Sequence, residues 1–256
     1  MRRQVLEPPY IYRWTVLFLA IALVAAVLVQ TFQSEPEAAE PTHAQARPRP
    51  AAKPDPVSAQ LIRRLATNDR VVALTFDDGP HPVHTPRVLD LLAEYDAVAT
   101  FCMVGSQARR HPNLVRDVVD AGMRLCNHTV RHDARLARRP LPAIDRELIQ
   151  ASDDLHAAAG DDVPIGYFRA PGGNWSRPLE RTAARHGMRP LGWTVDPRDW
   201  SRPGTAKIVA AVRRGVRPGS VILLHDGGGE RDQTVAALEK LLPWLTDEGY
   251  RLDFPA

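Results

Sequence analysis

Short apolar runs alternate with amphipathic stretches from about residue 57 to the end of the chain. The first run, 71–76, has the β-branched and aromatic composition of a buried strand. The stretch after it carries apolar residues at helical spacing behind Thr85-Pro86, which is predicted to be a helix N-cap followed by proline at the first helical position. The same pattern predicts further strands at 98–104, 123–126, 165–168, 191–195, 221–224 and 250–252.

This alternation predicts an α/β fold, because parallel strands need helical crossovers that cover the sheet. About seven strand–helix units within roughly 200 residues favour a (β/α) barrel, and an incomplete one. An open, doubly wound sheet is the alternative.

The N-terminal region has the pattern of a membrane anchor. Residues 14–32 carry no charge, and Arg2, Arg3 and Arg13 precede them. This length is close to the ~20 residues that cross a bilayer, and the preceding positive charge places residues 1–13 in the cytoplasm. We therefore expect a single-pass transmembrane signal anchor with the remaining chain outside the cell. A cleaved signal peptide and a secreted protein form the alternative, although no small-x-small site directly follows the apolar run.

Composition divides the rest of the chain in two. Residues 33–56 are rich in Pro, Ala and Glu and have too few large apolar side chains to form a core, which predicts an extended linker. Residues 57–256 are predicted to form one domain. The formal net charge of the whole chain is +3, and no basic cluster accounts for it, so the sequence does not indicate nucleic-acid binding.

Polar side chains directly follow most of the predicted strands. In parallel α/β folds the carboxyl ends of the strands lie at one edge of the sheet, where active sites form. We therefore expect these side chains to meet there. They are Asp77 and Asp78, then Asn127, His128 and His132, then Arg169, then Asp196, Asp199 and Trp200, and last His225 and Asp226.

His128 and His132 are candidate metal ligands. Because they are four residues apart, one helical turn would point both imidazoles the same way. Alone, such a pair is also common on solvated surfaces. With a carboxylate from another strand end it would form a two-histidine, one-carboxylate set that suits Zn²⁺ with one position open for water. Non-haem iron uses a similar set, so another divalent metal is an alternative. Asn127 and backbone groups are candidates to orient the imidazoles.

The remaining candidates suggest acid–base chemistry. The aspartate beside the ligand aspartate could act as a base, and Arg169 could keep it ionised or form a plain salt bridge. His225 could be a structural histidine bonded to the backbone, or a general acid that Asp199 holds and tunes. Trp200 could belong to the core or form a wall for a sugar or acyl group.

Five segments in a fixed order carry a resemblance to a known family. They are T-F-D-D-G-P at 75–80, H-T-V-R-H at 128–132, R-A-P-G at 169–172, D-P-R-D-W at 196–200 and L-L-H-D at 223–226. Together they resemble the polysaccharide deacetylase (NodB-homology) family, carbohydrate esterase family four, from about residue 71 to 252. The resemblance implies a distorted, incomplete α/β barrel.

The resemblance also implies a role for individual residues. Asp78, His128 and His132 match the metal ligands, with zinc as the usual ion. Asp77 matches the catalytic base that Arg169 orients, and His225 matches the general acid that Asp199 tunes. The backbone N–H of Gly172 would help to stabilise the oxyanion. Four residues are expected to contact substrate: Pro171, Gly172, Trp200 and Leu223. Two positions depart from the family pattern, Thr129 in place of a common serine and Gly172 in place of a larger residue.

The implied reaction is hydrolytic removal of acetyl groups from N-acetylated sugars of a polysaccharide. We expect the N-acetylglucosamine of peptidoglycan to be the substrate, because an anchor would keep the domain near that polymer. Deacetylation of chitin oligomers, an esterase activity on acetylated xylan, and a non-catalytic glycan-binding module are the alternatives. The sequence predicts no oligomeric state.

The two cysteines of the chain, Cys102 and Cys126, fall in neighbouring predicted strands. Outside the membrane they could form a disulfide. Two buried thiols are the alternative, because neighbouring strands often give a poor disulfide geometry.

Overall fold

The computed structural model describes residues 55–255. The expected cytoplasmic N-terminus and transmembrane anchor, and the linker up to residue 54, lie outside the described residues. Within the described part of the chain, no helix combines the length and the apolar content that crossing a bilayer requires.

The core of the structure is one curved, parallel sheet. Its strands run in the order β5-β4-β3-β2-β1-β6, and β7 pairs with the start of β1. Every pair in the sheet is parallel, as the strand–helix alternation predicts. The strands are β1 (Val71–Asp77), β2 (Ala99–Met103), β3 (Arg124–Asn127), β4 (Ile165–Phe168), β5 (Arg189–Pro190), β6 (Val221–His225) and β7 (Arg251–Leu252).

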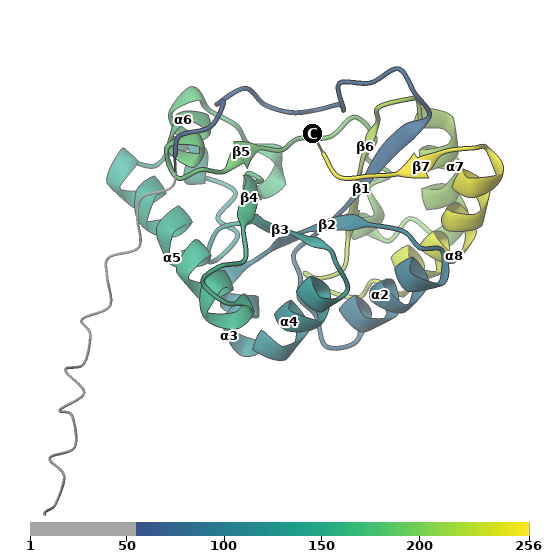
Figure 1. Ribbon diagram of the computed structural model, residues 1–256, viewed down its shortest axis with the longest axis horizontal. Helices are drawn as coiled ribbons and strands as arrows, with labels where there is room; N and C mark the ends of the chain where they lie inside the picture. The colour runs from purple at the N-terminus through teal and green to yellow at the C-terminus, as the bar shows by residue number, and fades with distance from the viewer. Residues whose placement is uncertain (1–54, 256) are drawn as a thin grey trace, which may run out of the picture. The chain divides into compact units, whose positions relative to one another are not determined.

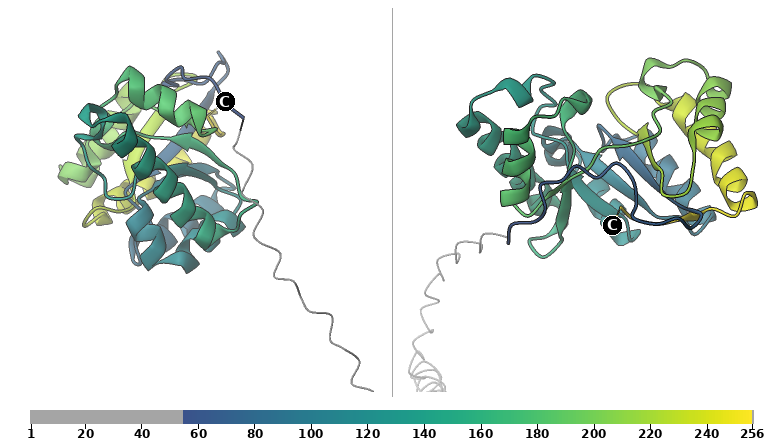
Figure 2. Two further views of the ribbon diagram at one scale, coloured as in Figure 1. Left: turned by 90° about the vertical axis from the view of Figure 1, so that its left-hand side faces the viewer. Right: turned by 90° about the horizontal axis from the view of Figure 1, so that it is seen from above.

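Helices cover the outer, convex side of this sheet, as Figures 1 and 2 show. The α-helices are α2 (His84–Glu94), α3 (Gly105–Arg110), α4 (Pro112–Asp120), α5 (Leu141–Ala159), α6 (Arg177–Arg185), α7 (Thr205–Gly215) and α8 (Asp232–Asp247). Three short 3-10 turns complete the set: η1 (Leu136–Arg138), η2 (Pro171–Gly173) and η3 (Asp199–Ser201).

Side-chain alternation along β1 divides the core into two layers. Val72, Leu74 and Phe76 belong to the large cluster that packs beneath the helices. Val71 and Ala73 belong to a smaller cluster on the other side of the sheet, together with both cysteines. Because successive side chains of a strand point to opposite faces, Thr75 and Asp77 lie on the inner, concave face as well.

The barrel is incomplete, and one predicted strand is wrong. Residues 191–195 do not continue β5. The backbone N–H of Gly192 donates to the Ile62 carbonyl at 2.7 Å, which draws the chain away from β4. Three residues later Val195 pairs with Ile222 of β6. The segment thus spans the gap between the two edges of the sheet instead of forming a full strand beside β4.

The helices differ from the sequence pattern in two places. The structure contains α3, which the sequence pattern did not predict. The Thr85 side chain does not cap α2, which begins at His84 without any side-chain cap. Its hydroxyl instead accepts a hydrogen bond from the His81 N–H at 2.7 Å and donates to Asp226 at 2.5 Å.

Of the two alternatives for the cysteines, the structure has the disulfide. Cys102 and Cys126 are paired in register across β2 and β3, and their sulfur atoms are bonded.

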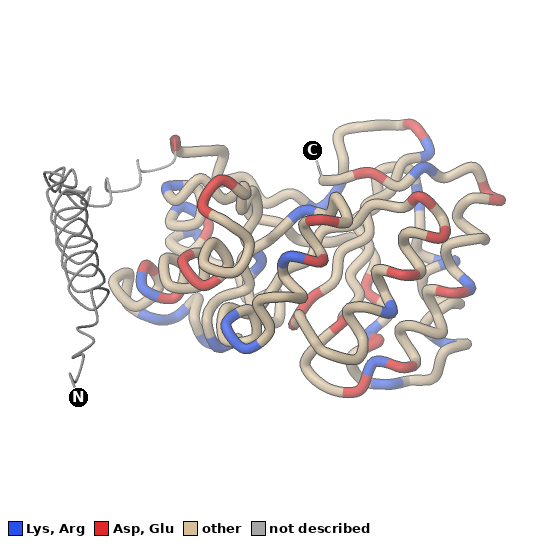
Figure 3. Tube along the Cα trace, turned by 60° about the horizontal axis from the view of Figure 1, so that its bottom comes forward, with Lys and Arg blue, Asp and Glu red and all other residues tan. Residues whose placement is uncertain are grey.

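Figure 3 shows acidic and basic residues interspersed along the described chain.

Candidate active site

The end of β1 and the turn after it carry two acidic side chains, Asp77 and Asp78, and are tied to both neighbouring strands. The Asp77 carbonyl accepts the Asp226 N–H at 3.1 Å, from the segment that follows β6. The Gly79 carbonyl accepts the Val104 N–H at 2.9 Å, from the segment that follows β2. Asp78 between them adopts the left-handed region, with φ 72°, which is uncommon for a residue other than glycine.

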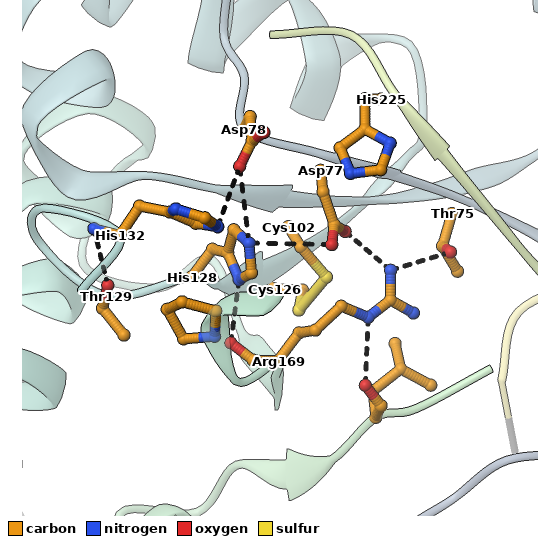
Figure 4. Close-up of polar contacts among 12 residues, drawn as sticks. Thr75, Asp77, Asp78, Cys102, Cys126, His128, Thr129, His132, Arg169 and His225 are labelled. Carbon is orange, nitrogen blue, oxygen red and sulfur yellow. Dashed lines mark hydrogen bonds and ion pairs between the residues drawn. A yellow bond between two sulfur atoms is a disulfide. The ribbon is translucent and has the colours of Figure 1, made fainter. Parts of the chain in front are cut away.

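Asp78, His128 and His132 form a compact cluster at this edge of the sheet (Figure 4). The Asp78 Oδ1 atom lies 3.5 Å from His128 Nε2 and 3.4 Å from His132 Nε2. Ligands about 2.0–2.2 Å from a tetrahedral ion are separated by roughly 3.3–3.5 Å, so these two distances suit one shared ion.

The state of the donor atoms also fits a metal ion. Asp78 Oδ1 is buried and has no hydrogen-bond partner among the described residues, which is costly for a carboxylate oxygen unless a cation binds it. The Nδ1 atom of His128 lies 2.8 Å from the Arg169 carbonyl oxygen. A carbonyl only accepts, so Nδ1 carries a proton, and in the neutral imidazole that binds a metal Nε2 then keeps its lone pair toward Asp78.

The two histidines come together by a route that differs from the prediction. No helical turn connects them, because the loop from His128 to His132 is irregular, with positive φ angles at Thr129 and His132. The Thr129 hydroxyl accepts the His132 N–H at 3.0 Å. Asn127 does not contact the imidazoles either, since its amide group binds Leu148, Ser152 and the Thr129 N–H.

The pKa values in the cluster reflect close packing of unlike charges. Burial acts to raise the pKa of Asp78, but the neighbouring His128 and His132 hold it well below its usual range. Burial acts to lower the pKa of His128, yet Asp77 and Asp78 raise it above its usual value. Burial and the charge of His128 lower the pKa of His132. Asp78 is therefore a carboxylate at neutral pH, as a metal ligand must be.

Asp77 lies beside this cluster and is held by a buried arginine. Arg169 is fully buried, and its Nη1 atom lies 2.6 Å from Asp77 Oδ1 and 2.9 Å from the Thr75 hydroxyl. The remaining guanidinium nitrogens donate to the carbonyls of Leu191 and Gly192. Every side of the guanidinium is thus fixed, so the position of Asp77 is fixed as well.

His225 faces the same cluster from the end of β6. Its Nδ1 atom lies 2.8 Å from Asp199 Oδ1, while Asp199 Oδ2 accepts the His225 N–H and the Thr234 hydroxyl. Burial acts to lower the pKa of His225, but the hydrogen bond to Asp199 and its charge raise it above the usual value. His225 is thus a buried imidazole that keeps its proton to higher pH than a free histidine.

A cleft of about 630 Å³ opens over these groups. Of the residues expected to contact substrate, Gly172, Trp200 and Leu223 line it, and Trp200 is 45% exposed. Pro171 is buried and does not line the cleft.

Some residues without a predicted role also line the cleft or support the site beneath it. Trp193 and Arg131 line the cleft, and Arg131 belongs to the ligand loop, with a side chain that is 77% exposed. Thr75 and Thr234 support Arg169 and Asp199 from behind. Their short side chains leave no periodic signal, and only Thr75, within the T-F-D-D-G-P motif, could have been found from the sequence.

Comparison with known proteins agrees with this geometry. The family model described as polysaccharide deacetylase matches residues 64–191. The chain is 43% identical to a chitooligosaccharide deacetylase from Sinorhizobium fredii over 75% of this chain and 93% of that protein. It is 39% identical to a peptidoglycan-N-acetylglucosamine deacetylase from Bacillus cereus over 73% of this chain and 87% of that protein.

A solved structure with the same architecture is a CE4 family pseudoenzyme from Bacillus anthracis. It superposes with a TM-score of 0.71 at 26% identity and covers 77% of this chain and 67% of that one. The family match covers half of the chain, and the two curated relatives match over most of their length. The chain therefore belongs to the polysaccharide deacetylase family.

Proposed function

We propose that this protein is a metal-dependent N-deacetylase that removes acetyl groups from N-acetylated sugars of a polysaccharide. The observation that carries the proposal is the convergence of three sets of groups in one cleft. A possible metal cluster, a carboxylate held by a buried arginine and a histidine held by a buried aspartate all face the same space. Amide hydrolysis needs a bound nucleophile, a base and an acid, and each set supplies one of them.

Each side chain then has a defined task. A bound divalent ion would polarise the acetyl carbonyl and make water a stronger nucleophile at neutral pH. Asp77 would accept the proton of the attacking water, since its carboxylate Oδ2 faces the cluster, 3.6 Å from His128 Nε2. His225 would donate a proton to the departing amine. Gly172 lines the cleft, and its N–H has no hydrogen-bond partner among the described residues, so this N–H would be available to the oxyanion.

We propose zinc as the ion. Two imidazole nitrogens and one carboxylate oxygen form the ligand set typical of hydrolytic zinc sites that keep a position open. The spacing of Asp78 Oδ1 from the two imidazole nitrogens, 3.5 and 3.4 Å, supports a small tetrahedral ion. Other divalent metals with the same ligand preference could restore activity after chelation in place of zinc.

The substrate we propose is the glycan of peptidoglycan, at its N-acetylglucosamine residues. Trp193 and Trp200 line the cleft and provide aromatic surface for sugar rings. Arg131 offers a cation at the lining, and its one ion pair among the described residues is with Glu147, at 3.8 Å. Peptidoglycan carries carboxylates on alternate sugars and on its peptides, whereas chitin is neutral. The cation therefore favours peptidoglycan over chitin oligomers or acetylated xylan.

We further propose that the domain works outside the cell, held to the membrane by the apolar segment at residues 14–32. The disulfide between Cys102 and Cys126 supports an oxidising compartment. Secretion after cleavage is the alternative arrangement, and the two differ in whether the mature protein sediments with membranes.

Acetate release tests the proposal directly. The full-length protein should release acetate from peptidoglycan strands faster than from chitin oligomers or acetylated xylan. Chelation should abolish the release, and added zinc should restore it. Faster release from chitin oligomers would reassign the substrate but keep the chemistry. No release from any of the three by folded, zinc-loaded protein would reject the enzyme and favour a glycan-binding role, as the existence of a family pseudoenzyme allows.

A further inference from the structure

Asp226 has no role in the chemistry described above, although it comes directly after His225. It is fully buried, and burial raises the pKa of its carboxyl to about 7. The Oδ2 atom accepts a hydrogen bond from the Thr85 hydroxyl at 2.5 Å. The Oδ1 atom is buried with no partner among the described residues. A half-satisfied buried carboxyl destabilises a fold, so its presence here calls for a function.

The Thr85 hydroxyl connects Asp226 to the turn after β1. While it donates to Asp226, it also accepts the His81 N–H at 2.7 Å. His81 lies three residues after the ligand Asp78. One short chain of hydrogen bonds therefore links the end of β6, the first turn of α2 and the segment that leaves the metal cluster.

The Asp226 carboxyl also packs directly on the backbone of this turn. A Cβ atom added at Gly79 would overlap with both carboxyl oxygens of Asp226. The next two residues, Gly227 and Gly228, pack just as closely on Asp78. A Cβ at Gly227 would overlap with the Asp78 backbone, and a Cβ at Gly228 would overlap with the Asp78 side chain. The segment after β6 thus forms a close-fitting support beneath Asp78 and Gly79.

Asp78 needs such support because of its backbone conformation. A left-handed φ is unfavourable for a residue other than glycine and persists only where the surroundings enforce it. The metal cluster, in turn, requires the Asp78 carboxylate to stay within about half an ångström of one position. Backbone hydrogen bonds hold Asp77 and Gly79, and the Asp226–Thr85 pair holds the next residues of the turn, up to His81.

We propose that Asp226 and Thr85 are positioning residues that keep Asp78 in its metal-binding conformation. Neither side chain touches the substrate or the ion. They act through the backbone of Gly79 and His81. This inference rests on the proposed metal site but not on any substrate.

Binding of Co²⁺ to the full-length protein tests the proposal, because the visible spectrum of Co²⁺ reports the geometry of its ligands. Thr85→Val replaces only the hydroxyl by a methyl group of similar size, and Asp226→Ala removes the carboxyl. Each should weaken Co²⁺ binding roughly 10- to 100-fold, the range for groups that orient metal ligands, and should alter the spectrum. The conservative variants Thr85→Ser and Asp226→Asn keep the hydroxyl and the accepting oxygen, so both should bind Co²⁺ almost as the wild type does.

Asp154→Asn is the matched control. Asp154 is also a buried aspartate that packs against a glycine, Gly105, and its side chain pairs with Arg109 rather than with a residue of the metal cluster. Its substitution should lower thermal stability and leave the Co²⁺ affinity and spectrum unchanged. If Thr85→Val, as a folded protein, binds Co²⁺ with wild-type affinity and spectrum, the inference is wrong. If the wild type itself binds no Co²⁺, both the proposed metal site and this inference are wrong. If the wild type binds Co²⁺ but has no deacetylase activity, the proposed function is wrong and this inference is unaffected.

Discussion

Two clusters of histidine and carboxylate lie within the described residues, and only one has the properties of a metal site. The first is Asp78 with His128 and His132, and the second is His84 with Glu230 and Asp232. Judged only by their residue types and by the distances between their donor atoms, both clusters would be candidate metal sites. In the first cluster the ligand aspartate is largely buried, whereas in the second both carboxylate side chains are about two-thirds exposed.

The orientation of the lone pairs separates the two clusters further. The Arg169 carbonyl holds the His128 proton on Nδ1 and leaves Nε2 available to an ion. His84 Nε2 instead accepts the Arg231 N–H at 3.2 Å, so its proton lies on Nδ1, the atom that faces Asp232 at 3.9 Å. Asp232 is already paired with Arg87 at 2.5 Å. The second cluster is therefore a set of ion pairs and hydrogen bonds, and the groups behind each ligand decide which cluster can bind a metal.

Replacing one histidine in each cluster should give the largest difference in zinc binding and activity. His128→Ala should abolish both stoichiometric zinc binding and acetate release, because two ligands rarely hold zinc in a hydrolytic site. His84→Ala should keep one zinc per chain and its activity. Metal content of the purified variants and acetate release measure the two effects, and zinc lost in His84→Ala but kept in His128→Ala would reverse the assignment.

Asp77→Asn should separate metal binding from catalysis within the first cluster. The amide keeps the size of the side chain but cannot accept the proton of the attacking water. We expect kcat to fall about 10²- to 10⁴-fold, the usual contribution of a general base, with zinc still bound. Wild-type turnover in this variant, with wild-type zinc content, would remove Asp77 from the mechanism.

The pH profile should then show what Asp199 does for His225. A general acid must be protonated, so activity falls as the pH rises through its pKa. Burial lowers the pKa of His225 and the carboxylate of Asp199 raises it to a net value above the usual one. Asp199→Asn removes that charge, so the alkaline fall of kcat/KM should move to lower pH. An alkaline limb at the wild-type position would show that another group acts as the acid.

The smallest expected effect concerns stability alone. His84 is buried and stacks on His81 with ring centroids 4.6 Å apart. His84→Ala should lower the free energy of unfolding by about 1–3 kcal/mol, the cost of a lost buried hydrogen bond and a small cavity. Denaturant unfolding with and without zinc measures it. A loss of stability that appears only with zinc present would mean that the second cluster also binds metal.

The sequence predicted which strand ends carry the site, but not how the loops shape it. The strands β1 and β6 could be predicted because mostly apolar runs precede Asp77 and His225. The prediction of a strand at 191–195 was wrong, because long-range pairing of Gly192 and Val195 overrides a local β-rich pattern. The left-handed residues at Thr129 and His132 also escape any periodicity, since only tertiary contacts enforce them.

The supporting groups were the hardest to predict. Arg169 as the partner of Asp77 and Asp199 as the partner of His225 follow from charge and from the family motifs, and the structure brings each pair together. The carbonyl of Arg169 as the partner of His128 could not be predicted, because every residue has a carbonyl and only the fold selects one. The same holds for the Thr85 hydroxyl, which the sequence pattern suggested as a helix cap.

The zinc content of the chain and of its two histidine variants tests the central claim most directly. Equilibrium dialysis of the full-length protein against zinc should give one bound ion per wild-type chain, one per His84→Ala chain and none per His128→Ala chain. Two ions per wild-type chain, or one ion that survives His128→Ala, would contradict the assignment of the metal site to Asp78, His128 and His132.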